Sequence, residues 1–85
     1  MANDETDLQH VVRRLKRAQG QIGGIIAMIE SGRSTQEVVT QVAAVSKAID
    51  RAGFAVIATG LRQSVNDPDS GVDMDQMEKL FLSLA

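Results

Sequence analysis

Apolar residues in the first third of the chain recur at alternating steps of three and four. The series is Leu8, Val11, Leu15, Ala18, Ile22, Ile25 and Ile29. This spacing keeps one stripe on a single face of an α-helix and matches the a and d positions of a heptad repeat. It predicts one long helix over about residues 6–31, whose apolar face Val12 and Ile26 widen.

A turn and a second helix should follow. Gly32 comes just after the last apolar position and suits the residue that ends a helix. Ser34 and Glu37 match the capping box that begins the next one, with Ser34 as the N-cap. The second helix is expected over about 35–65. Its apolar face comprises Val38, Val42, Val45, Ile49, Ala52 and Val56.

The stretch from Asn66 to Gly71 is rich in turn-forming residues and should end the second helix. Asp73 and Gln76 then form another capping-box candidate. A short amphipathic helix over 73–84 follows, with Met74, Met77, Leu80, Phe81 and Leu84 on its apolar face. The prediction is a single all-α domain over residues 1–85, a long antiparallel hairpin with a short C-terminal helix.

The wide apolar faces predict self-association. Helices of this length extend roughly 40 Å, and a third helix of roughly 18 Å cannot cover both. We therefore expect a dimer of hairpins packed as a four-helix bundle, with further assembly left open. Gly20, Gly23 and Gly24 interrupt the first helix, which indicates either close approach of another backbone or local fraying.

The formal charge is −2, but its distribution is uneven. Residues 13–62 carry eight bases and three acids, whereas both flanking segments are acidic. The bases of interest are Arg13, Arg14, Lys16, Arg17, Lys47 and Arg51. In a hairpin turning near Ser34, residues whose numbers sum to about 68 lie side by side, which places Arg17 level with Arg51.

Such a basic band is either a solvated surface or a site for the DNA phosphate backbone. The chain has no Trp or Tyr and only two Phe, so it is poor in rings on which bases could stack. Both main helices are too long for a helix-turn-helix. Phosphate contact with double-stranded DNA is therefore better supported than the reading of bases.

Catalytic and metal chemistry is poorly represented. The chain has no Cys and one His, so no set of transition-metal ligands can form from these side chains, and no cofactor is expected. His10 is either an exposed helix residue or a metal ligand or pH sensor. We expect no enzyme activity. The acidic first residues and the absence of a long apolar run predict a cytoplasmic protein without a membrane segment.

The segments RLKRAQGQI (14–22), MIE (28–30), VTQVAAV (39–45) and DR (50–51) closely resemble the copper-sensing operon repressors and their nickel-, cobalt- and formaldehyde-sensing relatives. The resemblance covers about residues 8–84. It implies a dimeric four-helix bundle, a dimer-of-dimers tetramer, and binding of operator DNA that an effector releases. It also implies that Arg14, Arg17 and Arg51 contact the DNA.

The same resemblance locates a sensor site whose usual ligands are missing here. Thr35, Gly60 and Ser64 occupy the positions where the family has a Cys, a His, and a Cys or His. Hydroxyls and a glycine cannot hold Cu(I) and make a poor nickel or zinc site. Three interpretations stay open: a repressor with another small-molecule effector, a ligand-independent DNA-binding protein, or an oligomerisation partner of a cysteine-bearing paralogue.

Overall fold

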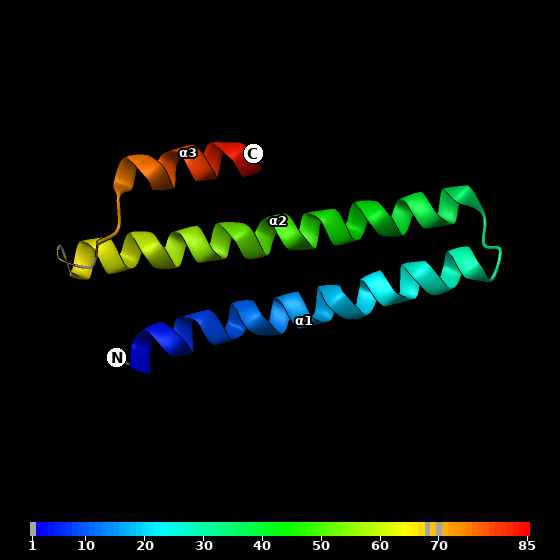
Figure 1. The fold of residues 1–85 in the computed structure, drawn as a ribbon, viewed down its shortest axis with the longest axis horizontal. Coiled ribbons are helices and arrows are strands. Elements are labelled where there is room, and N and C mark those ends of the chain that lie inside the picture. Colours follow the sequence, from blue (N-terminus) through cyan, green and yellow to red (C-terminus); the bar gives the residue numbers. More distant parts are fainter. Residues whose placement is uncertain (1, 68, 70) are drawn as a thin grey trace.

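The computed structural model describes residues 2–67, 69 and 71–85. Three helices make up the fold: α1 (Ala2–Glu30), α2 (Thr35–Asn66) and α3 (Met74–Leu84), and the described residues contain no strand. α1 and α2 form an antiparallel hairpin, and α3 folds back along the C-terminal half of α2 on the side away from α1 (Figure 1). The predicted all-α hairpin with a short third helix is confirmed.

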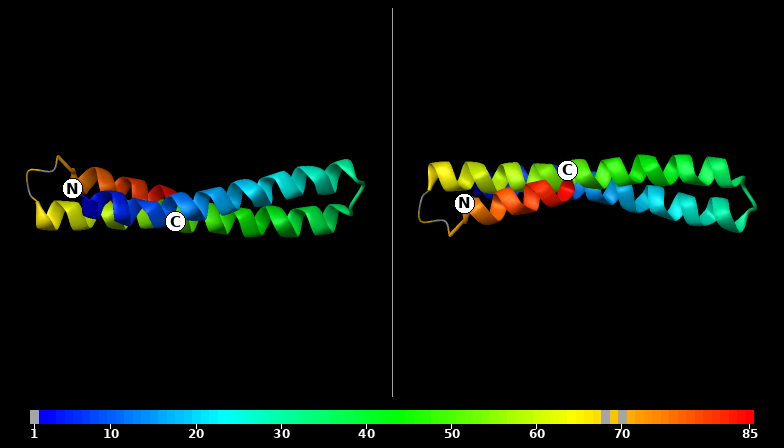
Figure 2. Two further views of the ribbon diagram at one scale, coloured as in Figure 1. Left: turned by 90° about the horizontal axis from the view of Figure 1, so that it is seen from below. Right: turned by 90° about the horizontal axis from the view of Figure 1, so that it is seen from above.

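The three helices form a thin layer, which measures 53 × 27 × 12 Å and is seen edge-on in both views of Figure 2. α2 is the central helix, since α1 and α3 each pack against it. A layer one helix thick cannot enclose a core, so both of its faces remain open along most of their length. These two faces are where a partner molecule can bind.

The start of α1 was predicted about four residues too late. The helix begins at Ala2 rather than near residue 6. The opening residues are polar, so a search for apolar periodicity does not detect them. They contain neither Gly nor Pro, so nothing stops the helix from continuing through them.

The turn between α1 and α2 is a Schellman motif. Gly32 has a φ of 83°, a left-handed conformation that glycine adopts without the steric cost of a Cβ. The amide of Arg33 donates to the carbonyl of Met28 at 2.9 Å, and that of Gly32 donates to Ile29 at 3.2 Å. These two bonds satisfy carbonyls at the end of α1, so the chain reverses at the predicted place.

Both predicted N-cap residues, Ser34 and Asp73, begin the helices that follow. Ser34 accepts the amide of Glu37 at 3.2 Å and also donates from its hydroxyl to the Glu37 carboxylate. Arg33 forms an ion pair with Glu37 at 2.9 Å. At α3, the carboxylate of Asp73 accepts the amides of Asp75 and Gln76.

The hydrogen bonds from Ser34 and Arg33 lower the pKa of Glu37 below its usual 4.5. A depressed folded-state pKa means that this carboxylate stabilises the fold above its unfolded-state pKa. The stabilisation is lost as the pH falls through the folded-state value. The effect of the cap is therefore expected to be largest near neutral pH.

Ser34→Ala is expected to lower the free energy of unfolding by roughly 1 kcal/mol near pH 7, because the first turn of α2 loses its N-cap. Urea unfolding at fixed protein concentration measures this change. The difference from wild type should narrow as the pH falls below the usual carboxyl value of 4.5 and through the lower pKa of Glu37 in the folded protein. Ser46→Ala, at an exposed position inside α2, is the control and should not destabilise. An equal loss in both variants would contradict the capping role.

The buried seam of the hairpin is narrow. Val11 and Ala18 of α1 lie against Val45 and Ala52 of α2, all at 5% exposure or less. The contact between α2 and α3 is made by Phe54 and Phe81, whose ring centroids are 5.1 Å apart. So small a core leaves most large apolar side chains partly in solvent.

The glycines of α1 meet no close neighbour in the protomer. A Cβ built on Gly20, Gly23 or Gly24 would have no atom within 4 Å among the described residues. The close backbone approach considered from the sequence is therefore not made within one chain. α1 nevertheless runs without a break through these positions, so the alternative of local fraying is not observed either.

Candidate nucleic-acid interface

The seam between α1 and α2 divides the hairpin into two faces of opposite chemistry. Consecutive residues of an α-helix are about 100° apart, so positions three and four residues after a seam residue lie on opposite sides of the seam. On α1, Arg14 follows Val11 by three and Leu15 follows it by four. On α2, Ala48 and Ile49 bear the same relation to Val45.

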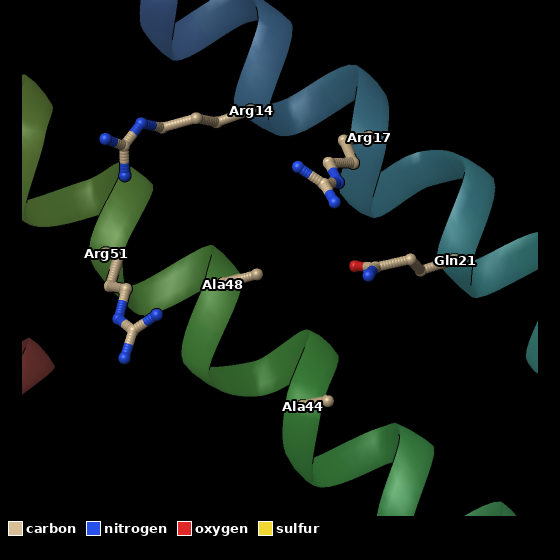
Figure 3. A pocket seen from close by; sticks show the side chains of 6 residues that line it. All are labelled: Arg14, Arg17, Gln21, Ala44, Ala48 and Arg51. Carbon is tan, nitrogen blue, oxygen red and sulfur yellow. The ribbon is translucent and has the colours of Figure 1, made fainter.

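One face carries a basic groove of about 510 Å³ between α1 and α2. It is lined by Arg14, Arg17, Gln21, Ala44, Ala48 and Arg51. In Figure 3, Arg14, Arg17 and Gln21 extend from α1 toward α2, and the methyl groups of Ala44 and Ala48 project into the space that faces them. The three arginines named by the family resemblance therefore line a single groove.

The other bases of the predicted band lie elsewhere. Lys16 lines a groove on the apolar face, with Leu15 and Ile22. Arg13 and Lys47 are exposed and line neither of these two grooves. The run of bases at 13–17 is continuous in sequence, but the helical rotation spreads it around α1.

Among the described residues, no acidic side chain forms an ion pair with the groove arginines. The ion pair found within the described residues joins Arg33 and Glu37, at the hairpin turn. Asp50 is adjacent to Arg51 in sequence but does not line the groove. Three positive charges therefore face solvent together, and walls of low polarizability beside them concentrate their field.

Three lining residues were not identified from the sequence. Ala44 and Ala48 leave the groove open because their side chains are single methyl groups, and Gln21 adds a neutral amide at one end. The register of numbers summing to about 68 places Gln21 level with this part of α2. Alanines on α2 opposite the bases of α1 were therefore the signal in the sequence that could have predicted a groove instead of a flat basic surface.

The opposite face is apolar and open. Ten large aliphatic side chains on α1 and α2 are each between 38% and 59% exposed. They are Leu8, Val12, Leu15, Ile22, Ile26, Ile29, Val39, Val42, Ile49 and Val56. Monomeric proteins rarely leave so extended an apolar surface in water.

The three positions of the degenerate sensor site do not meet within one protomer. Thr35 begins α2, and the helical rise puts Gly60 roughly 37 Å further along. Ser64 is one turn beyond Gly60. A Cβ on Gly60 would lie 3.4 Å from the Met77 sulfur, so α3 occupies the space beside it. These residues supply no imidazole or thiolate, and the described residues hold no cluster of three His, Cys, Asp or Glu side chains placed to bind a metal.

Together, the fold and the groove define a class: an all-helical protein with a basic groove on one face of its hairpin and exposed aliphatic side chains on the other. The family model for metal-sensitive transcriptional repressors matches residues 7–83, and the chain belongs to that family of transcriptional regulators. Searches of curated proteins and of solved structures find no significant match. Within the described residues, no helix has the length and apolar character needed to cross a bilayer.

Proposed function

We propose that this protein is a cytoplasmic transcriptional repressor that binds double-stranded operator DNA as a homo-oligomer. The observation that carries the proposal is the groove lined by Arg14, Arg17 and Arg51, with which no acidic side chain of the described residues forms an ion pair. Guanidinium groups bind phosphate through paired hydrogen bonds, and their charge attracts a polyanion. Membership of a repressor family supports DNA as that polyanion.

The remaining bases have a secondary role in this proposal. Arg13 and Lys47 are exposed and extend the positive field around the groove, where they approach phosphates of the same duplex. Lys16 lines the apolar face and adds only to the overall positive charge of α1. Binding is expected to depend mainly on phosphates, since no aromatic residue lines the groove. Sequence preference would then arise from the shape and flexibility of the operator.

The apolar face supports the oligomer. Two hairpins that pack through their exposed aliphatic side chains form a four-helix bundle, and the basic grooves then lie on its outside. A dimer of such dimers would repeat the grooves along the duplex. Each repeated groove adds phosphate contacts, so the affinity of the assembly exceeds that of one protomer.

The effector in this proposal is not a metal held by the usual sensor ligands. Thr35 and Ser64 offer only hydroxyls, which are poor ligands for Cu(I), Ni(II) and Zn(II), and Gly60 has no side chain to bind a metal. The repressor therefore responds to a different small molecule or binds DNA without an effector. The second candidate function is a partner role, in which the apolar face joins a cysteine-bearing paralogue.

Fluorescence anisotropy with a duplex from the protein's own promoter tests the DNA proposal. We expect binding at 50 mM salt that weakens by about a thousandfold or more at 200 mM, because six or more phosphate contacts release counterions. The absence of binding at low salt would overturn it. If no DNA binds but the protein forms mixed oligomers with a cysteine-bearing paralogue, that result would favour the partner role.

A further inference from the structure

We propose that the groove between α1 and α2 is also a binding site for a short linear polyphosphate, which competes with DNA for the same arginines. Anion binding follows from the groove itself, whereas the competition step rests on the proposed function. The inference supplies a route to DNA release that does not use Thr35, Gly60 or Ser64.

The first argument is charge. Arg14 and Arg17 extend from α1 toward α2, and Arg51 lines the same groove from α2 with its guanidinium turned away from α1 (Figure 3). The groove is thus bordered by three permanent positive charges, and no carboxylate of the described residues pairs with them. Each guanidinium has five N–H donors and no acceptor. The groove is therefore matched to a ligand that carries several negative charges and only acceptor oxygens along its length.

The second argument is shape. The volume of about 510 Å³ lies within the roughly 300–1,000 Å³ of small-molecule sites. The wall on α1 runs from Arg14 to Gln21, which is roughly 10 Å of helix, so it favours a chain of phosphates over a single one. Ala44 and Ala48 let such a chain descend between the helices (Figure 3).

The third argument concerns which polyphosphate is recognised. The groove residues include no aromatic ring and no carboxylate. A nucleotide base would find no aromatic ring on which to stack, and ribose hydroxyls would find no charged acceptor. The recognised chemistry is therefore the phosphate chain, whether it is inorganic or belongs to a nucleoside triphosphate.

Isothermal titration calorimetry of the full-length protein with sodium tripolyphosphate at low salt tests the site. We expect saturable binding, with ATP within about threefold of tripolyphosphate and sulfate of equal ionic strength much weaker. Arg17→Ala should weaken tripolyphosphate binding at least about tenfold, because a charged hydrogen-bonding partner is lost. Lys79→Ala, an exposed base on α3, should change it less than threefold.

A variant that keeps every charge separates the groove from a general electrostatic effect. Ala48→Leu should fill the groove and weaken tripolyphosphate binding at least about tenfold. Circular dichroism shows whether Ala48→Leu still folds. If it does not, Ala44→Leu, at an exposed position, fills the groove instead and tests the same expectation. No saturable binding, unchanged binding in the correctly folded leucine variant, or ATP binding more than tenfold tighter than tripolyphosphate would each overturn the site.

Competition is measured with the promoter duplex. Tripolyphosphate should release DNA at concentrations where sodium chloride of equal ionic strength does not. DNA binding that tripolyphosphate cannot reverse would overturn the competition. A protein that binds tripolyphosphate but no DNA would instead refute the proposed function and leave the anion site standing.

Discussion

Ile22→Glu combined with Ile49→Glu is expected to abolish self-association and, with it, DNA binding. The two side chains line the same apolar groove from α1 and α2 and are 43% and 42% exposed in the protomer. In a symmetric dimer the double variant places four carboxylates in an apolar interface. Each uncompensated charge costs several kcal/mol, so the dimer dissociation constant should rise by at least about a thousandfold.

Size-exclusion chromatography with light scattering measures the loss of the oligomer, and circular dichroism reports the helices. Val65→Glu is the matched control, because Val65 is also an aliphatic residue of α2 but is 77% exposed. It should leave the assembly unchanged. A double variant that keeps the wild-type mass at micromolar concentration would show that this face is not the interface.

The boundaries at the hairpin turn and at the start of α3 could be predicted because local signals specify them, whereas the start of α1 carries no such signal. The turn between α1 and α2 needs a residue with positive φ followed by a hydroxyl cap, and Gly32 and Ser34 supply both. Before α3, Gly71 has the positive φ and the carboxylate of Asp73 is the N-cap. These hydrogen bonds depend on residues within one turn of each other, so the sequence alone contains the required information.

The site was only partly predictable, because it depends on helix rotation. A run of bases at 13–17 reads as one cluster, but the rotation of α1 places Arg14 and Arg17 on one side of the seam. Lys16 lies on the other side. The depth of the groove is set by Ala44 and Ala48 across the seam, and no charge pattern reports the size of a neighbouring side chain.

The apolar face, too, could be predicted only in part from the sequence. Its heptad spacing predicts that the face is buried, and a single protomer buries only the seam residues such as Val11 and Ala18. The remainder requires a second molecule, whose geometry one chain does not contain. The glycines of α1 also need a second molecule if they mark a close contact, since no other helix of the described residues comes within 4 Å of a Cβ built on them.

Arg17→Ala combined with Arg51→Ala is expected to weaken binding to the promoter duplex by at least about a hundredfold at 50 mM salt. The two arginines reach the groove from different helices, so the double variant removes positive charge from both of its walls. For a dimer with both protomers on DNA, four phosphate contacts are lost. The slope of log affinity against log salt should therefore become shallower by about 3 to 4.

The salt slope is the decisive measurement, because a variant that merely unfolds loses affinity without a defined change in slope. Lys16→Ala is the matched control: it removes one base from the same helix, but Lys16 lines the apolar groove. Its slope should change by less than Arg17→Ala alone produces. Equal changes for Lys16→Ala and Arg17→Ala would mean that DNA contacts the whole basic surface of α1, and the groove would lose its special role.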